Sequence, residues 1–181
     1  LGSGLKTFVT GELEGLGSNL ILVVPGEIDT QRGFATARGG GLGAITTSKL
    51  ELLDVEHIQD EVPEVAEASG LLIGSEVVKY ASTKKTVQII GTTSNFPQVR
   101  NAQIAKGEFF QQSDVTSGRR VTVLGANVAS EYFLGEDPLG EKMQVGKLRY
   151  KVIGILEKIG GLGQTNLDDQ AIIPITAAQR Q

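Results

Sequence analysis

The sequence predicts an α+β protein in which a short αβ segment precedes a strand-rich, barrel-like part. Two observations lead to this fold class. Apolar residues recur at helical spacing near the amino terminus and again before residue 62, and after about residue 70 the period becomes that of short strands. Turn-forming residues then follow at close intervals up to about residue 175, a pattern typical of small barrels.

The amino-terminal elements should be a helix, a strand and a long loop. Residues 4–16 carry apolar side chains at helical spacing, and Gly17 stands where a C-cap glycine would end the helix. Residues 19–25 form a short apolar strand that ends in a Pro-Gly turn. Residues 26–46 lack periodicity and are rich in glycine, so we expect a mobile loop there.

A second helix is predicted from Ser48 to about Val62. Ser48 and Glu51 have the spacing of a capping box, and Pro63 ends the helical pattern. We expect the inward face of this helix to consist of Leu50, Leu53, Ile58 and Val62.

Short elements follow in quick succession after residue 64. The predicted strands cover residues 65–78, 86–91, 120–124, 141–145, 148–156 and 171–175. The predicted helical segments are 98–104 and 126–134, and the predicted turns include 81–84, 137–140 and the pair Gly146-Lys147. We therefore expect a strand-rich lobe from about 70 to 175.

The composition excludes several classes of function. The net charge is −4, which disfavours nucleic acid and anionic membrane surfaces as partners. The chain has no Cys and one His, which excludes disulfides, thiolate nucleophiles and Cys-based zinc sites. The longest apolar run, Leu20 to Val24, is far too short for a membrane helix. Because the chain begins at Leu1 and stops after an apolar run, we expect both ends to be cut from a longer protein.

The sequence contains no convincing catalytic or ligand-binding motif. Residues 2–7 end like a phosphate-binding loop and residues 39–44 match a dinucleotide fingerprint, but neither follows a strand. We interpret His57 as an ordinary helix residue, because no second His or Cys could share a metal with it. The acidic pairs Glu136-Asp137 and Asp168-Asp169 are interpreted as soluble turns and strand edges. We therefore expect no catalytic residue, no cofactor and no metal.

Short motifs nevertheless recur along the chain in a fixed order. They lie at 15–26, 46–50, 91–99, 106–110 before Asp114, 120–125, 133–135, 137–141, 150–156 and 168–174. Together they resemble the core extracytoplasmic domain shared by MacB-type ABC transporter permeases and their FtsX-like relatives, over nearly the whole chain. They are turn and packing signatures, so the resemblance concerns a fold before it concerns a site.

The resemblance implies a division into three parts. Residues 1–17 would be a stalk-like helix, residues 18–70 an αβ porter-like lobe, and residues 71–181 an inserted β-rich, barrel-like lobe. In such families the chain returns to complete the first lobe before it enters the membrane again. Since this sequence stops at Gln181, we expect the porter-like lobe to lack its return segment.

The resemblance also implies a function. The domain would be the extracytoplasmic part, periplasmic or extracellular, of a cell-membrane permease that couples ATP-driven motion to export or extraction of cargo. The implied partners are an ABC ATPase subunit or domain, a periplasmic adaptor (membrane fusion) protein and a second copy in a homodimer. ATP hydrolysis would occur outside this chain, which would not itself be an enzyme.

Two alternative functions stay open at this point. One is an FtsX-like envelope module that recruits a wall hydrolase without transport, and the other is a free-standing ligand-binding domain. Within any of these, loop 26–46 and the segment around Phe96 are candidate contact surfaces, although both fit plain solvent loops as well. The candidate partner-contact residues are Phe34, Arg38, Leu42, Asn95 and Phe96.

Overall fold

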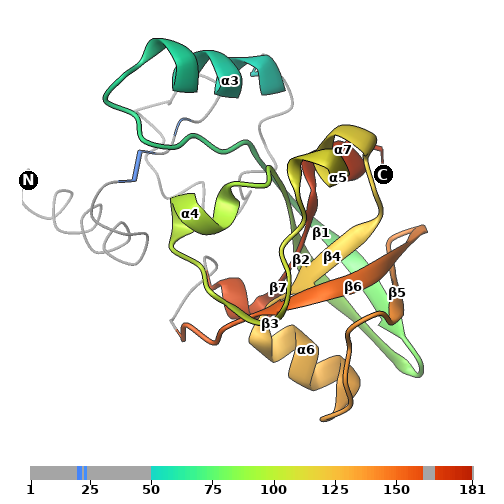
Figure 1. Ribbon diagram of the computed structural model, residues 1–181. Helices are drawn as coiled ribbons and strands as arrows, with labels where there is room; N and C mark the ends of the chain where they lie inside the picture. Colours follow the sequence, from blue (N-terminus) through green and yellow to red (C-terminus); the bar gives the residue numbers. More distant parts are fainter. Residues whose placement is uncertain (1–19, 22, 24–49, 161–165, 181) are drawn as a thin grey trace, which may run out of the picture.

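Seven β-strands of the described chain form one sheet that closes on itself. The computed structural model describes residues 20, 21, 23, 50–160 and 166–180. The strands follow the order β3-β6-β4-β7-β2-β1-β5, and β5 also pairs with β6 (Figure 1). Six strands therefore make a ring, and β3 extends it beside β6. This closed sheet with flanking helices confirms the predicted α+β class and its barrel-like part.

The elements are short, and their bounds are as follows. The strands are β1 (Leu71–Tyr80), β2 (Thr83–Thr92), β3 (Ile104–Gly107), β4 (Val121–Leu124), β5 (Lys142–Val145), β6 (Leu148–Leu156) and β7 (Gln170–Pro174). The helices are α3 (Leu52–Glu61), α4 (Phe96–Arg100), α5 (Gln112–Ser117), α6 (Ala126–Phe133), the 3-10 turn η3 (Leu167–Asp169) and α7 (Ile175–Ala178).

Two hairpins supply four strands of the ring. β1 and β2 pair antiparallel over their whole length, from Leu71 opposite Thr92 to Tyr80 opposite Thr83. The turn between them is tighter than the predicted one, because Ala81 adopts a left-handed conformation with φ 48°. The second hairpin, β5–β6, turns at Gly146 with φ 58°, as the sequence predicted.

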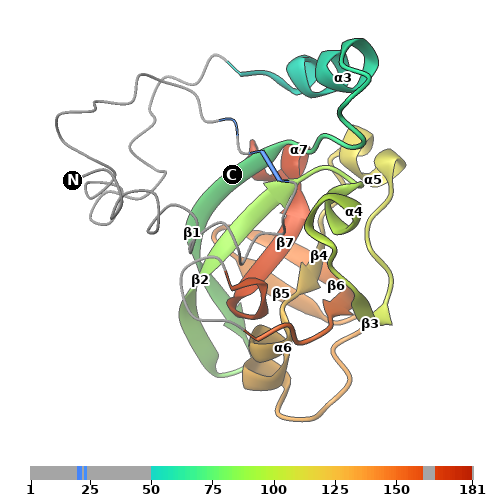
Figure 2. The ribbon, with the colours of Figure 1, turned by 90° about the vertical axis from the view of Figure 1, so that its left-hand side faces the viewer.

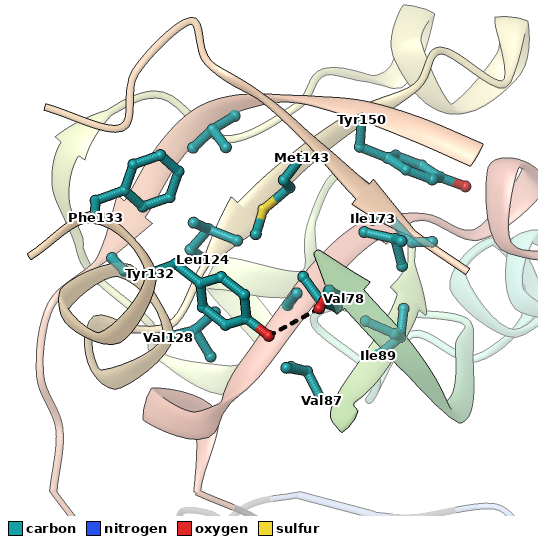
Figure 3. Close-up of a cluster of buried hydrophobic side chains, with 14 of the residues drawn as sticks. Val78, Val87, Ile89, Leu124, Val128, Tyr132, Phe133, Met143, Tyr150 and Ile173 are labelled. Atoms are coloured by element: carbon teal, nitrogen blue, oxygen red, sulfur yellow. Dashed lines mark hydrogen bonds between the residues drawn. The ribbon is translucent and has the colours of Figure 1, made fainter. Parts of the chain in front are cut away.

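Apolar side chains fill both the inside of the ring and part of its outer surface. Inside, residues of β1, β2, β4, β5, β6 and β7 meet helix α6, whose Tyr132 hydroxyl donates to the Val78 carbonyl at 3.2 Å (Figure 3). Outside, a second cluster lies under α4, α5 and α7. Ile172 belongs to the outer cluster and Ile173 to the inner one. Covered on both faces, β4 and β7 are buried at every position, and their sequences are mostly apolar.

Helix α3 lies beyond the end of the barrel at which β1 begins (Figure 2), and its Leu52 packs against the outer apolar cluster. It begins after Glu51, whose capping partner is Asp54; Ser48, the predicted cap, lies outside the described residues. The predicted inward face is wrong except at Ile58, because Leu50, Leu53 and Val62 are all exposed. The half-buried apolar positions are instead Leu52, Val55 and Ile58, which follow the i, i+3 spacing of the actual helix.

The largest errors of sequence-based prediction concern short elements. Residues 65–69 are an extended linker, not part of the following strand. The helix predicted at 98–104 lies earlier, at Phe96–Arg100, and ends at Asn101 in a left-handed conformation with φ 48°. β3 and α5 were not predicted, because four to six residues are too few to show a period. Of the strand predicted at 19–25, the described residues 20, 21 and 23 belong to no strand.

Candidate functional site

A polar network joins helix α3 to the barrel. The linker after Glu61 crosses the end of β2 before it enters β1, because Leu71 stands opposite Thr92. Seven residues make up what we call the α3–barrel junction: Gln59, Glu67, Ser69, Gly70, Thr92, Thr93 and Asn95.

Asn95 is the centre of this junction. Its Nδ2 donates to Glu67 Oε2 at 2.8 Å and to the Ala68 carbonyl at 2.7 Å, and its Oδ1 accepts from Thr93 Oγ1 at 2.8 Å. Gln59, on α3, donates to the same Glu67 oxygen at 3.1 Å. A single carboxylate oxygen therefore links the helix to the segment that begins α4.

Three hydroxyl groups complete the network. Thr92 Oγ1, which is buried, donates to the Gly70 carbonyl at 2.8 Å, and Thr93 Oγ1 donates to Asn95. Ser69 Oγ lies 3.0 Å from Thr92 Oγ1 and 2.8 Å from Thr93 Oγ1. Since both threonine protons are committed elsewhere, the single proton of Ser69 can be donated to only one of the two threonine oxygens at a time. The linker is thus held at the end of β2 by the bonds from Thr92 to Gly70 and from Asn95 to Glu67 and Ala68.

A small apolar contact lies beside the network. A Cβ placed at Gly70 would lie 3.2 Å from Leu52 Cδ2, 3.3 Å from Ile175 Cδ1 and 3.6 Å from Val55 Cγ2. Helices α3 and α7 therefore meet around this glycine. Helix α3 has no fully buried residue, whereas the barrel has two buried apolar clusters. Among the described residues, helix α3 is thus weakly attached to a well-packed body.

The structure places the sequence-predicted contact residues in different environments. Asn95 lies half-buried in the junction, with its amide engaged as described. Phe96 is 2% exposed and lies in the outer cluster near Phe109, with ring centroids 6.3 Å apart. It is the buried residue of α4, so its ring is not presented to a partner in this structure, nor does it lie in a solvent loop. Phe34, Arg38 and Leu42 lie outside the described residues.

Sequence reasoning missed the other members of the junction. Glu67 and Ser69 fell in a predicted strand, and Gln59 on the outside of a predicted helix. The one usable signal was the polar run Thr92-Thr-Ser-Asn95 directly after an apolar strand. A run of that kind at a strand end is where side chains bind neighbouring backbone.

The acidic residues of the barrel have structural roles. Asp168 is 1% exposed, so the interpretation of its pair as a soluble strand edge was wrong for this residue. Its carboxylate accepts from the amides of Ile159 at 3.0 Å and Gly160 at 2.9 Å, which fixes the chain after β6. Asp137 forms an exposed ion pair with Lys106 at 2.8 Å. His57 lies exposed on α3.

Asp114 is a buried carboxylate that is stabilised in its charged form by Arg119 and by a backbone amide. Burial raises its pKa, but hydrogen bonds from the Arg119 side chain at 2.9 Å and the Gln111 amide at 3.0 Å, with the charge of Arg119, lower it further than burial raises it. The net effect is a pKa below the ordinary value. Asp114 thereby caps α5 and ties that helix to the start of β4.

No helix among the described residues is both long enough and apolar enough to cross a membrane.

Relatives with similar sequences are exporters of two kinds. The chain is 27% identical, over 98% of its length, to the macrolide export ATP-binding/permease protein MacB of Bdellovibrio bacteriovorus. It is 31% identical over 97% of its length to the MacB of Marinobacter nauticus, and 29% identical over 98% to the pyoverdine export protein PvdT of Pseudomonas entomophila. The chain spans about a quarter of each relative: 26%, 26% and 25% of their lengths.

Solved structures share the fold. The periplasmic region of MacB from Actinobacillus actinomycetemcomitans matches 96% of this chain and 73% of its own, with a TM-score of 0.72 and 16% identity. The extracellular domain of the ABC-type transporter YknZ from Gram-positive bacteria matches 73% of this chain and 66% of its own, with a TM-score of 0.63 and 20% identity. A family model described as the MacB-like periplasmic core domain matches residues 1–181. The chain therefore belongs to the family of MacB-like periplasmic core domains.

Proposed function

We propose that this chain is the extracytoplasmic part of an ABC transporter permease and transmits ATP-driven motion to cargo that is exported across the cell envelope. The observation that carries the proposal is the family match over all 181 residues, joined to relatives named as export ATP-binding/permease proteins. Those names pair a permease with an ATP-binding part. ATP hydrolysis is accordingly assigned to a domain or subunit outside this chain, and the chain itself is assigned no enzymatic reaction.

The α3–barrel junction is the proposed point of transmission. A closed sheet with apolar clusters on both faces moves as one body, because any internal displacement would open packed contacts. Within the described part of the chain, helix α3 is held by few contacts, and one of its links to the barrel is the Gln59–Glu67–Asn95 chain of hydrogen bonds. Movement between the two therefore costs least at this junction.

Further partners belong to the same proposal. The permease would act as a homodimer and deliver cargo toward a periplasmic adaptor protein. Phe34, Arg38 and Leu42 remain the proposed contact residues for that adaptor. Asn95 is proposed to act through the junction, since its amide already binds Glu67, Ala68 and Thr93.

The experiment that tests this function uses the full-length permease with its ATP-binding part. Expressed in a bacterial strain that lacks its own macrolide exporters, it should raise the inhibitory concentration of erythromycin several-fold and increase efflux of the labelled drug. A variant with an inactivated ATP site is the control and should do neither. No export of erythromycin or of pyoverdine, together with ATP hydrolysis that responds to a bound wall hydrolase, would contradict the proposal.

A further inference from the structure

Among the described residues, strand β1 has an unpaired edge along its first half. β1 pairs with β2 throughout, but β5 pairs with it only at Val78 and Lys79. The Gly146 amide donates to the Val77 carbonyl at 3.0 Å, so the backbone groups of Val77 point away from β2. Because these groups alternate along an antiparallel strand, those of Leu71, Ile73 and Ser75 point the same way. No described residue pairs with them.

This edge lacks the features by which proteins usually prevent edge pairing. Residues 71–75 read Leu-Leu-Ile-Gly-Ser and contain no charge, no proline and no bulge. The turn end of β2, by contrast, carries Lys84 and Lys85. Leu71 and Leu72 are 38% and 42% exposed. An apolar, uncharged, regular edge of this kind is a template for another strand.

We propose that β1 pairs antiparallel with β1 of a second copy of this chain, across a two-fold axis at Ile73. In this register Ile73 faces itself, Leu71 faces Ser75, and Leu72 faces Gly74. The backbone groups of residues 71, 73 and 75 would form about six hydrogen bonds, one for each of the three donors in each copy. The edge is just long enough, since β5 ends at Val145 beside Val78, and Gly146 occupies the Val77 carbonyl just beyond the proposed partner strand.

The side chains favour a second copy over another occupant. Gly74 leaves open space, because a Cβ placed there would meet nothing within 4 Å. Across the two-fold axis, the exposed Leu72 of one copy would stand directly opposite the empty Gly74 position of the other. Since residues 71–75 carry no charge, two copies bring no like charges together. The open space at Gly74 and the lack of charge in residues 71–75 thus both allow β1 to pair with β1 of a second copy in this register.

This surface adds a contact to the homodimer of the proposed function and in that sense rests on it. A five-residue strand buries far less than a standard stable interface, so free chains should associate weakly. In a membrane, a second copy held nearby would raise the effective concentration and favour the contact.

Disulfide trapping tests the pairing, because the chain has no native cysteine. In the purified chain with Ile73→Cys, the two sulfur-bearing residues would have Cα atoms about 5.5 Å apart, within the range of a disulfide. Ser75→Cys is the matched control, since its two copies would be separated by four residues, or about 13 Å. Copper-catalysed oxidation should dimerise Ile73→Cys roughly tenfold faster or more, because a 13 Å gap cannot be bridged. Ser113→Cys, exposed on α5, measures random collision.

The register is tested by adding Gly74→Val to Ile73→Cys. The new side chain has free space within one copy, so folding should be kept, as circular dichroism would verify. It would fill the position opposite Leu72 of the second copy and should slow disulfide formation to the collision rate.

Equal rates for Ile73→Cys and Ser75→Cys, or no effect of Gly74→Val, would overturn the proposal. The proposal would also be overturned if no dimer formed and the amides of Ile73 and Ser75 were protected from hydrogen exchange in the monomer. That result would mean that another segment of the same chain pairs with this edge. Neither result depends on cargo or ATP, so each is separate from failure of the export test.

Discussion

Asn95 engages both its amide nitrogen and its amide oxygen in the junction and so connects three segments of the chain. It binds the linker through Glu67 and Ala68 and the end of β2 through Thr93. The sequence showed Asn95 as a polar residue at a break in the pattern, which suggested a partner. It could not show that the linker passes close by, because residues 67 and 95 approach each other only in the folded chain. Phe96, its neighbour, was expected at a contact surface but is buried, because the elements that cover it are distant in the sequence.

Replacement of Asn95 by alanine should destabilise the protein. Three hydrogen bonds are lost, and the half-buried Thr93 hydroxyl loses its acceptor. We expect a loss of about 1–3 kcal/mol in the free energy of unfolding, measured by urea denaturation. Asn127→Ala is the matched control, because Asn127 donates to an exposed carboxylate of Asp169 and should cost about 0.5 kcal/mol or less. Equal losses in both variants would contradict the role given to Asn95.

Asp114 makes stability depend on pH in a defined direction. Its pKa is lowered in the folded state, so its contribution is fully present above the unfolded pKa of about 3.9 and is lost as pH falls through the lower folded value. Asp114→Asn removes the charge at all pH values. Urea denaturation should therefore show the variant less stable at pH 7 by about 1–2 kcal/mol, with a difference that shrinks below pH ~4. A difference that stays constant down to pH ~2 would show that the charge is not its source.

Elements whose ends are marked in the sequence by glycine, or whose residues are mostly apolar, were predicted well. The hairpin β5–β6 has a glycine turn, α6 follows Gly125, and β7 is a continuous apolar run, and all three lie within two residues of their predicted bounds. The inward face of α3 was predicted wrongly, because which side of a peripheral helix meets the barrel depends on a contact around Gly70 that leaves no pattern in the sequence. Glycines were expected at turns, yet some of them serve close packing between elements.

Gly91 and Gly74 lie on neighbouring strands and offer a direct test of that packing. A Cβ at Gly91 would lie 2.6 Å from Ala178 Cβ on α7, whereas one at Gly74 would meet nothing within 4 Å. Gly91→Ala should therefore push α7 from the sheet and cost about 1–3 kcal/mol. Gly74→Ala should be neutral or stabilising by about 0.5 kcal/mol, since glycine is unfavourable within a strand. Urea denaturation of the two variants measures both effects. If the Gly91→Ala protein were as stable as the Gly74→Ala protein, the close packing of Gly91 against Ala178 would be refuted.

At the scale of the whole molecule, the described residues combine a closed barrel with a loosely attached helix. The close spacing of strands and turns predicted a barrel, but not how it closes, because the parallel pairing of β2 with β7 and the contact of β1 with β5 join residues far apart in sequence. The ordered motifs predicted the family, and the match to the MacB-like periplasmic core domain over residues 1–181 confirms it. The junction became visible only in three dimensions, and it is the feature on which the proposed transmission of motion depends.

The most direct test of that transmission is a reversible lock across the junction in the full-length exporter. A Cβ at Gly70 would lie 3.6 Å from Val55 Cγ2, so Val55→Cys with Gly70→Cys places two thiols within reach of a disulfide. Each single variant, oxidised in parallel, controls for the substitutions. With the disulfide formed, ATP-dependent efflux of erythromycin should be lost, and reduction should restore it. Efflux that continues unchanged while the disulfide is complete would contradict a role for movement at this junction in export.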